Sequence, residues 1–518
     1  MEGSKSALLL LFLASFHANG QFWQEVPIEA PDDVTPDGLF GAALDVDGDL
    51  LVVGAPGVDA GAPGSGSAYL YQRNAEGLQT WGFVQRILPP TPFTGGGFGS
   101  SVIFHGPYLF ISAPRERIGG ITRGAVHAYR FDAMGGAWEH EQRLSSEIAQ
   151  WDLATGVELT GAEDLLLAHA PGFDPVPGDE ALGCGALLTF RSDADGIFRS
   201  TRDIPGDQMV PGTSAQALQG WSAPCGNSLF YIGRDAKAYR LPLDAFRSDS
   251  DPMPTPVPLE LGPPFHPQDP SFQIKNGTSE GNSIYLVVSE PLFPPPSPPE
   301  PGAYYACVHL ECVGDEIVQH GYFVSDTADN DVIWDWGADA AAGAGRVIIG
   351  DPGDITFTPL GYAEVFGPDP SSATQWDRRG LLFPSDPEYG ARFGSAVAVG
   401  EDFAVVGAPW KGDQDRGKVY GFVDPSVGIA TTSVGPGLSI HPVPVRSGAT
   451  SSTVKIDLPT VPGSLQLITT DGRFVGERSV SGPVVWEFAG AATGSYVFMW
   501  RSRDGSIRPR SSRLIVLP

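Results

Sequence analysis

The sequence predicts an all-β protein made of seven repeated four-stranded sheets, followed by a small β-sandwich. Three observations predict it. An aromatic–glycine pair recurs at a fixed distance before a triplet of small residues. The 518 residues include 66 Gly and 48 Pro spread along the chain, which is typical of many tight turns between short strands. The net charge is −29, yet residues 438–518 carry 8 Arg and 1 Lys against 5 acidic residues, which indicates a second module.

The repeat is clearest in three units, in which a Phe lies 14 residues before the first residue of the triplet. These units are Phe40-Gly41 with Gly54-Ala55-Pro56, Phe98-Gly99 with Ser112-Ala113-Pro114, and Phe393-Gly394 with Gly407-Ala408-Pro409. The same spacing finds weaker copies that start at Thr155, Gln219, Lys275 and Trp336. Seven units at intervals of 56 to 64 residues predict a repeat architecture.

Each unit contains the pattern of four antiparallel strands. The first follows the aromatic–glycine pair, and the second is strongly apolar, as in residues 50–53 and 403–406. The third alternates, as in residues 66–71, and the fourth carries an aromatic residue such as Trp81. The large aromatic side chain fills the space between neighbouring sheets, and glycine allows their backbones to approach closely.

The seventh unit ends after its third strand, at Phe422. The N-terminal stretch from Phe22 to Val26 resembles the fourth strands at Trp81 and Trp138. We therefore expect it to complete the last sheet and close a ring, which makes residues 21–423 a seven-bladed β-propeller.

These motifs resemble the FG-GAP repeats of the integrin α-subunit propeller across residues 22–423. The resemblance implies a seven-bladed propeller, but it transfers no ligand, because function lies in the loops. It also implies that one face collects the connections between second and third strands. Here these are residues 58–65, 115–123, 173–182, 292–301 and 410–416. Trp410, Phe173 and Arg115 are the candidate ligand-binding residues on that face, set against the alternative of solvated loop decoration.

Many FG-GAP repeats hold Ca²⁺ in an Asp-rich loop, and Asp45, Asp47 and Asp49 come nearest to that pattern. Their turn is short, so an ordinary Asp-Gly hairpin is the favoured interpretation and no metal or other cofactor is expected. Residues 277–281 match a nucleophile-elbow string, but they lie in a predicted hairpin rather than between a strand and a helix. No catalytic residue is assigned.

The first twenty residues are predicted to be a signal peptide, with Lys5 before an apolar run and Gln21 as the mature start. Export permits disulfides, and the four cysteines allow three connectivities. Spacing alone favours Cys307–Cys312 as a local loop and Cys184–Cys225 as a longer link.

Residues 424–437 are predicted to be a linker, and residues 438–518 a small immunoglobulin-like β-sandwich. Its Pro442-Val443-Pro444 opening, its strand running to Asp471-Gly472-Arg473 and its final apolar strand resemble the type A C-terminal sorting domain of the type IX secretion system. The resemblance implies a Bacteroidetes-type bacterium, with the secretion machinery as a partner and the protein secreted or held at the outer membrane. Val443-Pro444 stands where the family has Asn-Pro.

The composition and motifs favour an exported binding or adhesion module, expected as a monomer, with an extracellular protein or glycan as its ligand. The strongly acidic charge excludes nucleic acid as a partner. Two alternatives remain open, a hydrolase or lyase built on the propeller and a purely structural surface module.

Overall fold

The computed structural model describes most of the chain as far as residue 424, and beyond it mainly strand segments. The described residues are 23–73, 80–146, 156, 158–172, 185–193, 195–210, 218–233, 235, 237–247, 252–265, 272–291, 303–314, 316–325, 336–353, 360–369, 375–424, 439–441, 445–446, 452–457, 463–469, 474–482, 484–488, 494–502 and 510–517. The predicted signal peptide and the linker from residue 425 onward lie outside them. By their contacts the residues form two units, one of residues 1–73 and 81–423, the other of residues 74–80 and 424–518.

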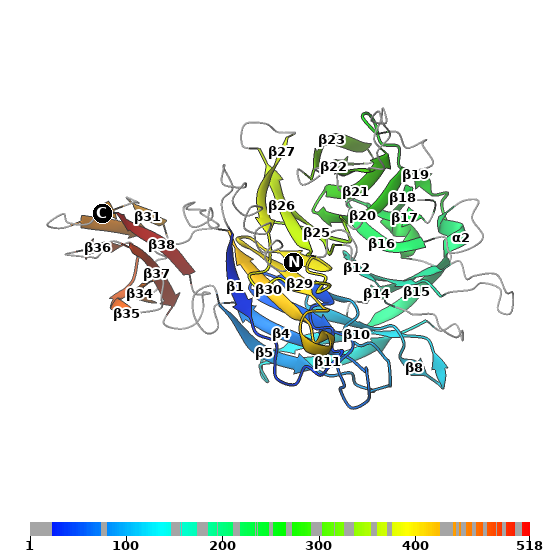
Figure 1. Cartoon of the computed structure of the whole chain (residues 1–518), viewed down its shortest axis with the longest axis horizontal. Helices are drawn as coiled ribbons and strands as arrows, with labels where there is room; N and C mark the ends of the chain where they lie inside the picture. Colours follow the sequence, from blue (N-terminus) through cyan, green and yellow to red (C-terminus); the bar gives the residue numbers. More distant parts are fainter. Residues whose placement is uncertain are drawn as a thin grey trace, which may run out of the picture. The chain divides into compact units, whose positions relative to one another are not determined.

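The first unit is a seven-bladed β-propeller (Figure 1), and every blade is a four-stranded antiparallel sheet. From the axis outward, blades 1 to 3 are β2 (Ala43–Asp47), β3 (Leu50–Ala55), β4 (Ser67–Arg73) and β5 (Trp81–Ile87); β6 (Val102–His105), β7 (Tyr108–Ala113), β10 (Ala125–Asp132) and β11 (Ala137–Leu144); and β12 (Leu159–Ala162), β13 (Leu165–Ala170), β14 (Ala186–Ser192) and β15 (Phe198–Pro205).

Blades 4 to 6 repeat this order. They are β16 (Leu218–Cys225), β17 (Ser228–Gly233), β18 (Ala238–Pro242) and β19 (Val257–Pro258); β20 (Gln273–Glu280), β21 (Ser283–Pro291), β22 (Ala303–Val313) and β23 (Glu316–Val324); and β24 (Asp339–Gly343), β25 (Arg346–Asp351), β26 (Tyr362–Pro368) and β27 (Trp376–Leu382). The short elements between strands are β8 (Arg117–Ile118), β9 (Ile121–Thr122), α2 (Gly206–Met209), η1 (Leu243–Phe246) and η2 (Asp413–Asp415).

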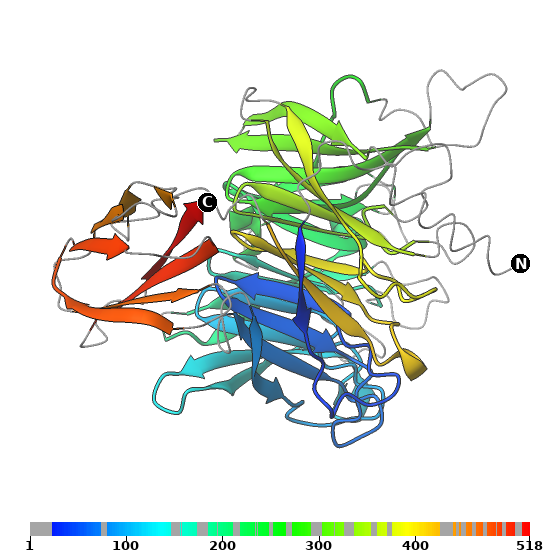
Figure 2. The ribbon, with the colours of Figure 1, turned by 60° about the vertical axis from the view of Figure 1, so that its left-hand side comes forward.

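Blade 7 consists of β28 (Ala396–Val399), β29 (Phe403–Ala408), β30 (Lys418–Val423) and, as its outermost strand, β1 (Gln24–Ile28). Figure 2 shows β1, in blue, beside the gold strands of this blade. The N-terminal strand therefore closes the ring, as the sequence predicts, with Val26 opposite Gly421. Each innermost strand contacts the innermost strands of both neighbouring blades. The apolar core lies in layers between adjacent blades.

The fixed spacing of the repeat has a direct structural cause. In blade 1 the N–H of Gly41 donates to the carbonyl of Gly54, the first residue of the triplet, at 3.0 Å. The equivalent bonds in blades 2, 3, 6 and 7 are Gly99 to Ser112, Gly156 to His169, Gly337 to Gly350 and Gly394 to Gly407, at 2.8 to 3.0 Å. All five donors have φ between 83° and 99°, a conformation that favours glycine.

The disulfide pairing predicted from spacing is wrong. Cys225, at the end of β16, bonds to Cys312 on β22 with a Cα–Cα distance of 6.0 Å. Cys307 and Cys312 both lie on β22, where five extended residues separate their Cα atoms by roughly 16 Å, far beyond the reach of a disulfide. The Cys184–Cys225 link is excluded because Cys225 is already bonded, and Cys184 lies outside the described residues. Cys307 is a buried free thiol.

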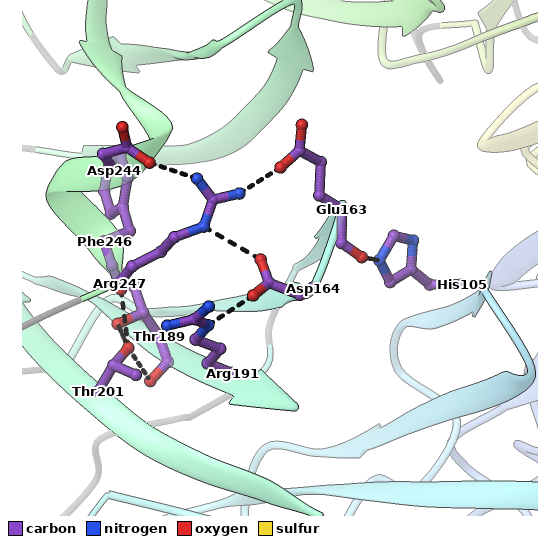
Figure 3. A network of polar contacts seen from close by, with 9 residues as sticks. All are labelled: His105, Glu163, Asp164, Thr189, Arg191, Thr201, Asp244, Phe246 and Arg247. Carbon is purple, nitrogen blue, oxygen red and sulfur yellow. Dashed lines mark hydrogen bonds and ion pairs between the residues drawn. The ribbon is translucent and has the colours of Figure 1, made fainter. Parts of the chain in front are cut away.

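A polar network joins blades 2 and 3 to the turn that follows β18 (Figure 3). The guanidinium of Arg247 donates to the carboxylates of Glu163, Asp164 and Asp244, and Arg191 also donates to Asp164. The imidazole of His105 on β6 is 2.9 Å from the carbonyl oxygen of Glu163. Because one arginine serves three carboxylates and is only 18% exposed, this network orders the blade junction more firmly than isolated surface pairs would.

The second unit contains two sheets within its described segments. One has the order β31 (Ser439–His441), β33 (Ser452–Asp457), β36 (Val484–Phe488). The other runs β32 (Val445–Arg446), β38 (Arg510–Leu517), β37 (Gly494–Ser502), β34 (Gly463–Thr469), β35 (Phe474–Val480). Across the described part of the whole chain, no helix is long and apolar enough to cross a membrane.

Candidate functional site

The connections over blades 7, 1 and 2 form a continuous rim on one face of the propeller, which we define as residues 32–40, 56–66, 89–98, 114–124, 384–393 and 409–417. In blades 7 and 1, backbone hydrogen bonds join the loop between the second and third strands to the connection into the next blade. Asp37 donates to Gln414, and Gly95 donates to Pro63 at the equivalent place one blade further on, at 2.6 and 2.8 Å. Main-chain hydrogen bonds therefore hold the rim segments together, and these bonds do not depend on which side chains the segments carry.

Trp410 and Arg115 occupy the same place in their repeats. Each directly follows its triplet, and each donates its N–H to the residue two positions before the Phe-Gly pair of its own repeat. The acceptors are Ala391 for Trp410 and Gly96 for Arg115, both at 3.2 Å. Two candidates from the sequence thus lie at equivalent rim positions, with Gly57 between them in blade 1.

Trp410 is 47% exposed although its backbone is fixed. The guanidinium of Arg392 lies over its ring, 4.9 Å from the ring centroid. Tyr389, on the same connection as Arg392, is 66% exposed. An aromatic ring with a cation on one face and solvent on its remaining surface can serve as a stacking platform for a ligand.

Ion pairs clamp the Trp410 loop to the connection before blade 7. Lys411 Nζ lies 3.1 Å from Glu388 Oε2 and 3.7 Å from Asp386 Oδ2. Asp386 also accepts hydrogen bonds from Lys418 and from the Tyr420 hydroxyl, at 2.9 and 2.7 Å. Burial raises the pKa of Asp386, but these hydrogen bonds and the nearby lysines outweigh it and lower that pKa, so the Asp386 carboxylate is ionised at neutral pH.

The blade 2 part of the rim presents exposed Arg115 and a second arginine–aromatic pair, with Arg117 placed 5.1 Å from the centroid of Phe93. Between the two arginines, Glu116 is only 2% exposed. Its carbonyl accepts the N–H groups of Arg123 and Gly124 at 3.1 Å, which fixes both ends of the loop.

Sequence reasoning missed Arg392, Tyr389 and the Phe93–Arg117 pair. The sequence does offer a signal for Arg392, because this residue directly precedes the Phe393-Gly394 pair of the repeat. The remaining sequence candidate, Phe173, lies outside the described residues, so the structure does not place it with the others.

Of the three aspartates considered as Ca²⁺ ligands, Asp45 is a buried hydrogen-bond acceptor. Asp45 on β2 accepts the N–H of Phe104 in blade 2 at 2.6 Å and that of Val46 at 2.9 Å, and burial raises its pKa to about 7. Asp47 ends β2, and Asp49 lies in the tight turn before β3. Within the described ranges, no group of three or more His, Cys, Asp or Glu side chains could hold a metal ion. Residues 277–281 run from β20 into a hairpin turn, as expected.

The FG-GAP repeat model matches residues 23–71 and 376–422. These two segments contain β1 to β4 and β27 to β30, so they meet where the ring closes. The fold and the repeat together define a seven-bladed β-propeller that carries FG-GAP repeats. No curated protein matches the sequence.

Three solved structures are similar in part. The extracellular domain of a hybrid two-component system from B. thetaiotaomicron has 9% sequence identity and a TM-score of 0.43, and the match covers 96% of this chain and 60% of that chain. The mitotic checkpoint complex has 10% identity and a TM-score of 0.41, with 77% of this chain and 96% of that chain covered. PorZ, a surface component of the type IX secretion system of Porphyromonas gingivalis, has 9% identity and a TM-score of 0.25, with 92% of this chain and 81% of that chain covered. This chain thus spans 60% of the length of the first. Values this low give no ground for transferring an activity.

Proposed function

We propose that the protein is an exported binding module whose rim recognises an extracellular ligand, with Trp410 and Arg115 as its anchors. The observation that carries the proposal is Trp410, a half-exposed ring whose backbone is hydrogen-bonded and whose face is in contact with the Arg392 guanidinium. A side chain ordered before binding loses little entropy on binding, and Trp and Arg are the residues most enriched at binding hot spots.

The chemistry of the rim fits a glycan best. An exposed aromatic face stacks on the apolar face of a sugar ring, and fixed guanidinium groups donate to hydroxyl or carboxylate oxygens. Arg392 and Trp410 supply this combination over blade 7, and Arg117 and Phe93 supply it over blade 2. A protein ligand would use the same anchors without the sugar stacking.

The Trp410→Ala variant should bind its glycan at least about 30-fold more weakly, the size of a hot-spot loss. A glycan array probed with the purified protein would identify the ligand, and calorimetry would give the affinity. Met134→Ala is the matched control, because Met134 is 99% exposed and lies in the β10–β11 turn, away from the rim. Glycan binding that survives both Trp410→Ala and Arg115→Ala would refute the rim as the site, and turnover of the bound glycan would favour an enzyme.

Two observations support export. The chain begins with a segment of signal-peptide character, and a disulfide joins blades 4 and 5. Disulfides persist in oxidising compartments and are rare in the cytosol. We further propose that residues 438–518 are an immunoglobulin-like β-sandwich that addresses the protein to type IX secretion in a Bacteroidetes-type bacterium.

A reporter fused to residues 438–518 should therefore reach the cell surface of a bacterium that has the type IX system. The control is the same fusion without residues 510–517, since β38 pairs with both β37 and β32 and its loss breaks the sheet. Surface labelling against a periplasmic marker measures the outcome. Retention of the intact fusion in the periplasm would contradict the proposal.

A further inference from the structure

Three side chains from separate parts of blade 2 form a chain of contacts that runs from the core to the surface. Glu116 lies in the rim loop, His127 on β10 and His140 on β11. Glu116 Oε2 is 2.6 Å from His127 Nε2, and His127 Nδ1 is 3.1 Å from His140 Nε2. Glu116 and His127 are buried at 2% and 0% exposure, whereas His140 is exposed.

The buried carboxylate sets the tautomer of His127. Thr91 Oγ1 donates to Glu116 Oε1 at 3.0 Å, and Arg143 Nη1 lies 3.5 Å from the same oxygen. The Glu116 carboxylate accepts a hydrogen bond from His127 Nε2–H, which leaves the His127 Nδ1 lone pair directed at His140.

The two imidazole nitrogens have the spacing of a pair of metal ligands. Two ligand nitrogens at about 2.0–2.1 Å from a tetrahedral Zn²⁺ stand roughly 3.3 Å apart, close to the 3.1 Å between His127 Nδ1 and His140 Nε2. A histidine that binds a metal almost always donates its other ring N–H to a carboxylate or carbonyl, as His127 does to Glu116. The carboxylate is an independent observation, because a bare contact between two imidazoles would not require it.

We propose that His127 Nδ1 and His140 Nε2 bind a divalent transition metal, with Zn²⁺ as the representative ion and water completing its coordination. Imidazole nitrogen suits Zn²⁺, Cu²⁺ and Ni²⁺ and discriminates against Mg²⁺ and Ca²⁺. Because Glu116 also fixes the Arg115 loop, the ion would stiffen the blade 2 part of the rim. The proposal does not depend on what the rim binds.

Blade 5 provides an internal comparison. His309 on β22 and His320 on β23 also lie on adjacent strands, but their rings stack at 5.1 Å with an interplanar angle of 29°. The Nε2 atom of His309 faces Ser283 at 3.2 Å, and that of His320 pairs with Glu311 at 2.5 Å. Stacked rings do not direct two lone pairs at one point, so His320→Ala removes a partly exposed histidine without touching the proposed site.

Calorimetric titration of the untagged full chain with ZnCl₂ at pH 7.5 tests the proposal. We expect one site that is lost in His140→Ala, weakened about tenfold or more in Glu116→Gln, and unchanged in His320→Ala. Zn²⁺, but not Mg²⁺, should raise the melting temperature of the wild type and not that of His140→Ala. The metal-free melting temperature of each variant shows that it is folded. Zn²⁺ affinity that is absent from the wild type, or equal in His140→Ala, would overturn the proposal.

Discussion

A chain that lacks residues 21–31 should fail to form a stable propeller, because these residues contain the outermost strand of blade 7. Five residues of β1 pair with β30, and Val26 and Ile28 are buried at 7% and 1% exposure in the layer between blades 7 and 1. Truncating one buried aliphatic side chain costs about 2–5 kcal/mol. The loss of two such side chains together with a strand should cost a free energy close to the whole unfolding free energy of a domain, about 5–15 kcal/mol.

The loss would spread beyond blade 7, because β1 and its flanks bond to three blades. The Ser385 N–H and hydroxyl, in the connection after blade 6, donate to the Glu25 carboxylate at 2.7 and 2.8 Å. The Tyr71 hydroxyl of blade 1 donates to the Glu29 carbonyl at 2.9 Å. Trp23 Nε1 donates to the Arg379 carbonyl of blade 6 at 3.3 Å. Removing the segment opens the ring where its two ends meet.

Circular dichroism and thermal unfolding of the deletion should show a lost or strongly lowered transition. A milder variant, Ile28→Ala, should fold but lose about 2–5 kcal/mol in denaturant unfolding. Gln24→Ala is the control, since Gln24 is exposed on the same strand. A deletion that melts at the wild-type temperature would show that blade 7 does not need β1.

Most of the propeller follows from one spacing. The glycine after the aromatic position lies 13 residues before the triplet, and at this distance its N–H bonds to the triplet across the hairpin of the first two strands. The spacing therefore survives in unit 3, where the aromatic residue is lost and His169 replaces Gly. Units 4 and 5 show the limit of this signal. Gly220 and Asn276 lie within β16 and β20, where the ladder is interrupted by register shifts instead.

The disulfide, the histidine pair and the rim contacts were less predictable than the fold, because each depends on residues that are distant in sequence. Cys225 and Cys312 meet because β16 and β22 lie in adjacent blades, which no count of residues between cysteines reveals. Glu116, His127 and His140 come from a loop and two strands, and only the pairing of β10 with β11 brings the imidazoles together. Trp410 and Arg115 could be chosen from the repeat, whereas the contact between Arg392 and the Trp410 ring is shown only by the fold.

The glycine of the triplet is one of the places where neighbouring blades approach closely. A Cβ added to Gly407 would lie 2.1 Å from the carbonyl oxygen of Gly41 in blade 1, and one added to Gly54 would lie 2.1 Å from that of Gly99 in blade 2. The contact at Gly350 is 2.0 Å, again to a backbone oxygen, that of Gly394. No rotamer change relieves a clash with main chain, and the glycine that bears each carbonyl is itself bonded into its own hairpin.

Gly407→Ala should therefore destabilise the propeller by about 3 kcal/mol or more, at the upper end of the usual cost of overpacking, because the methyl group must push blades 7 and 1 apart. Urea unfolding measured by tryptophan fluorescence would report the change as a lower midpoint. Gly262→Ala is the control, since its added Cβ would meet its nearest atom, Gln319 Oε1, at an ordinary 3.6 Å and should change stability by less than about 0.5 kcal/mol. Equal midpoints for the two variants would mean that the blades can separate without cost, and that the triplet glycine is not there to permit their approach.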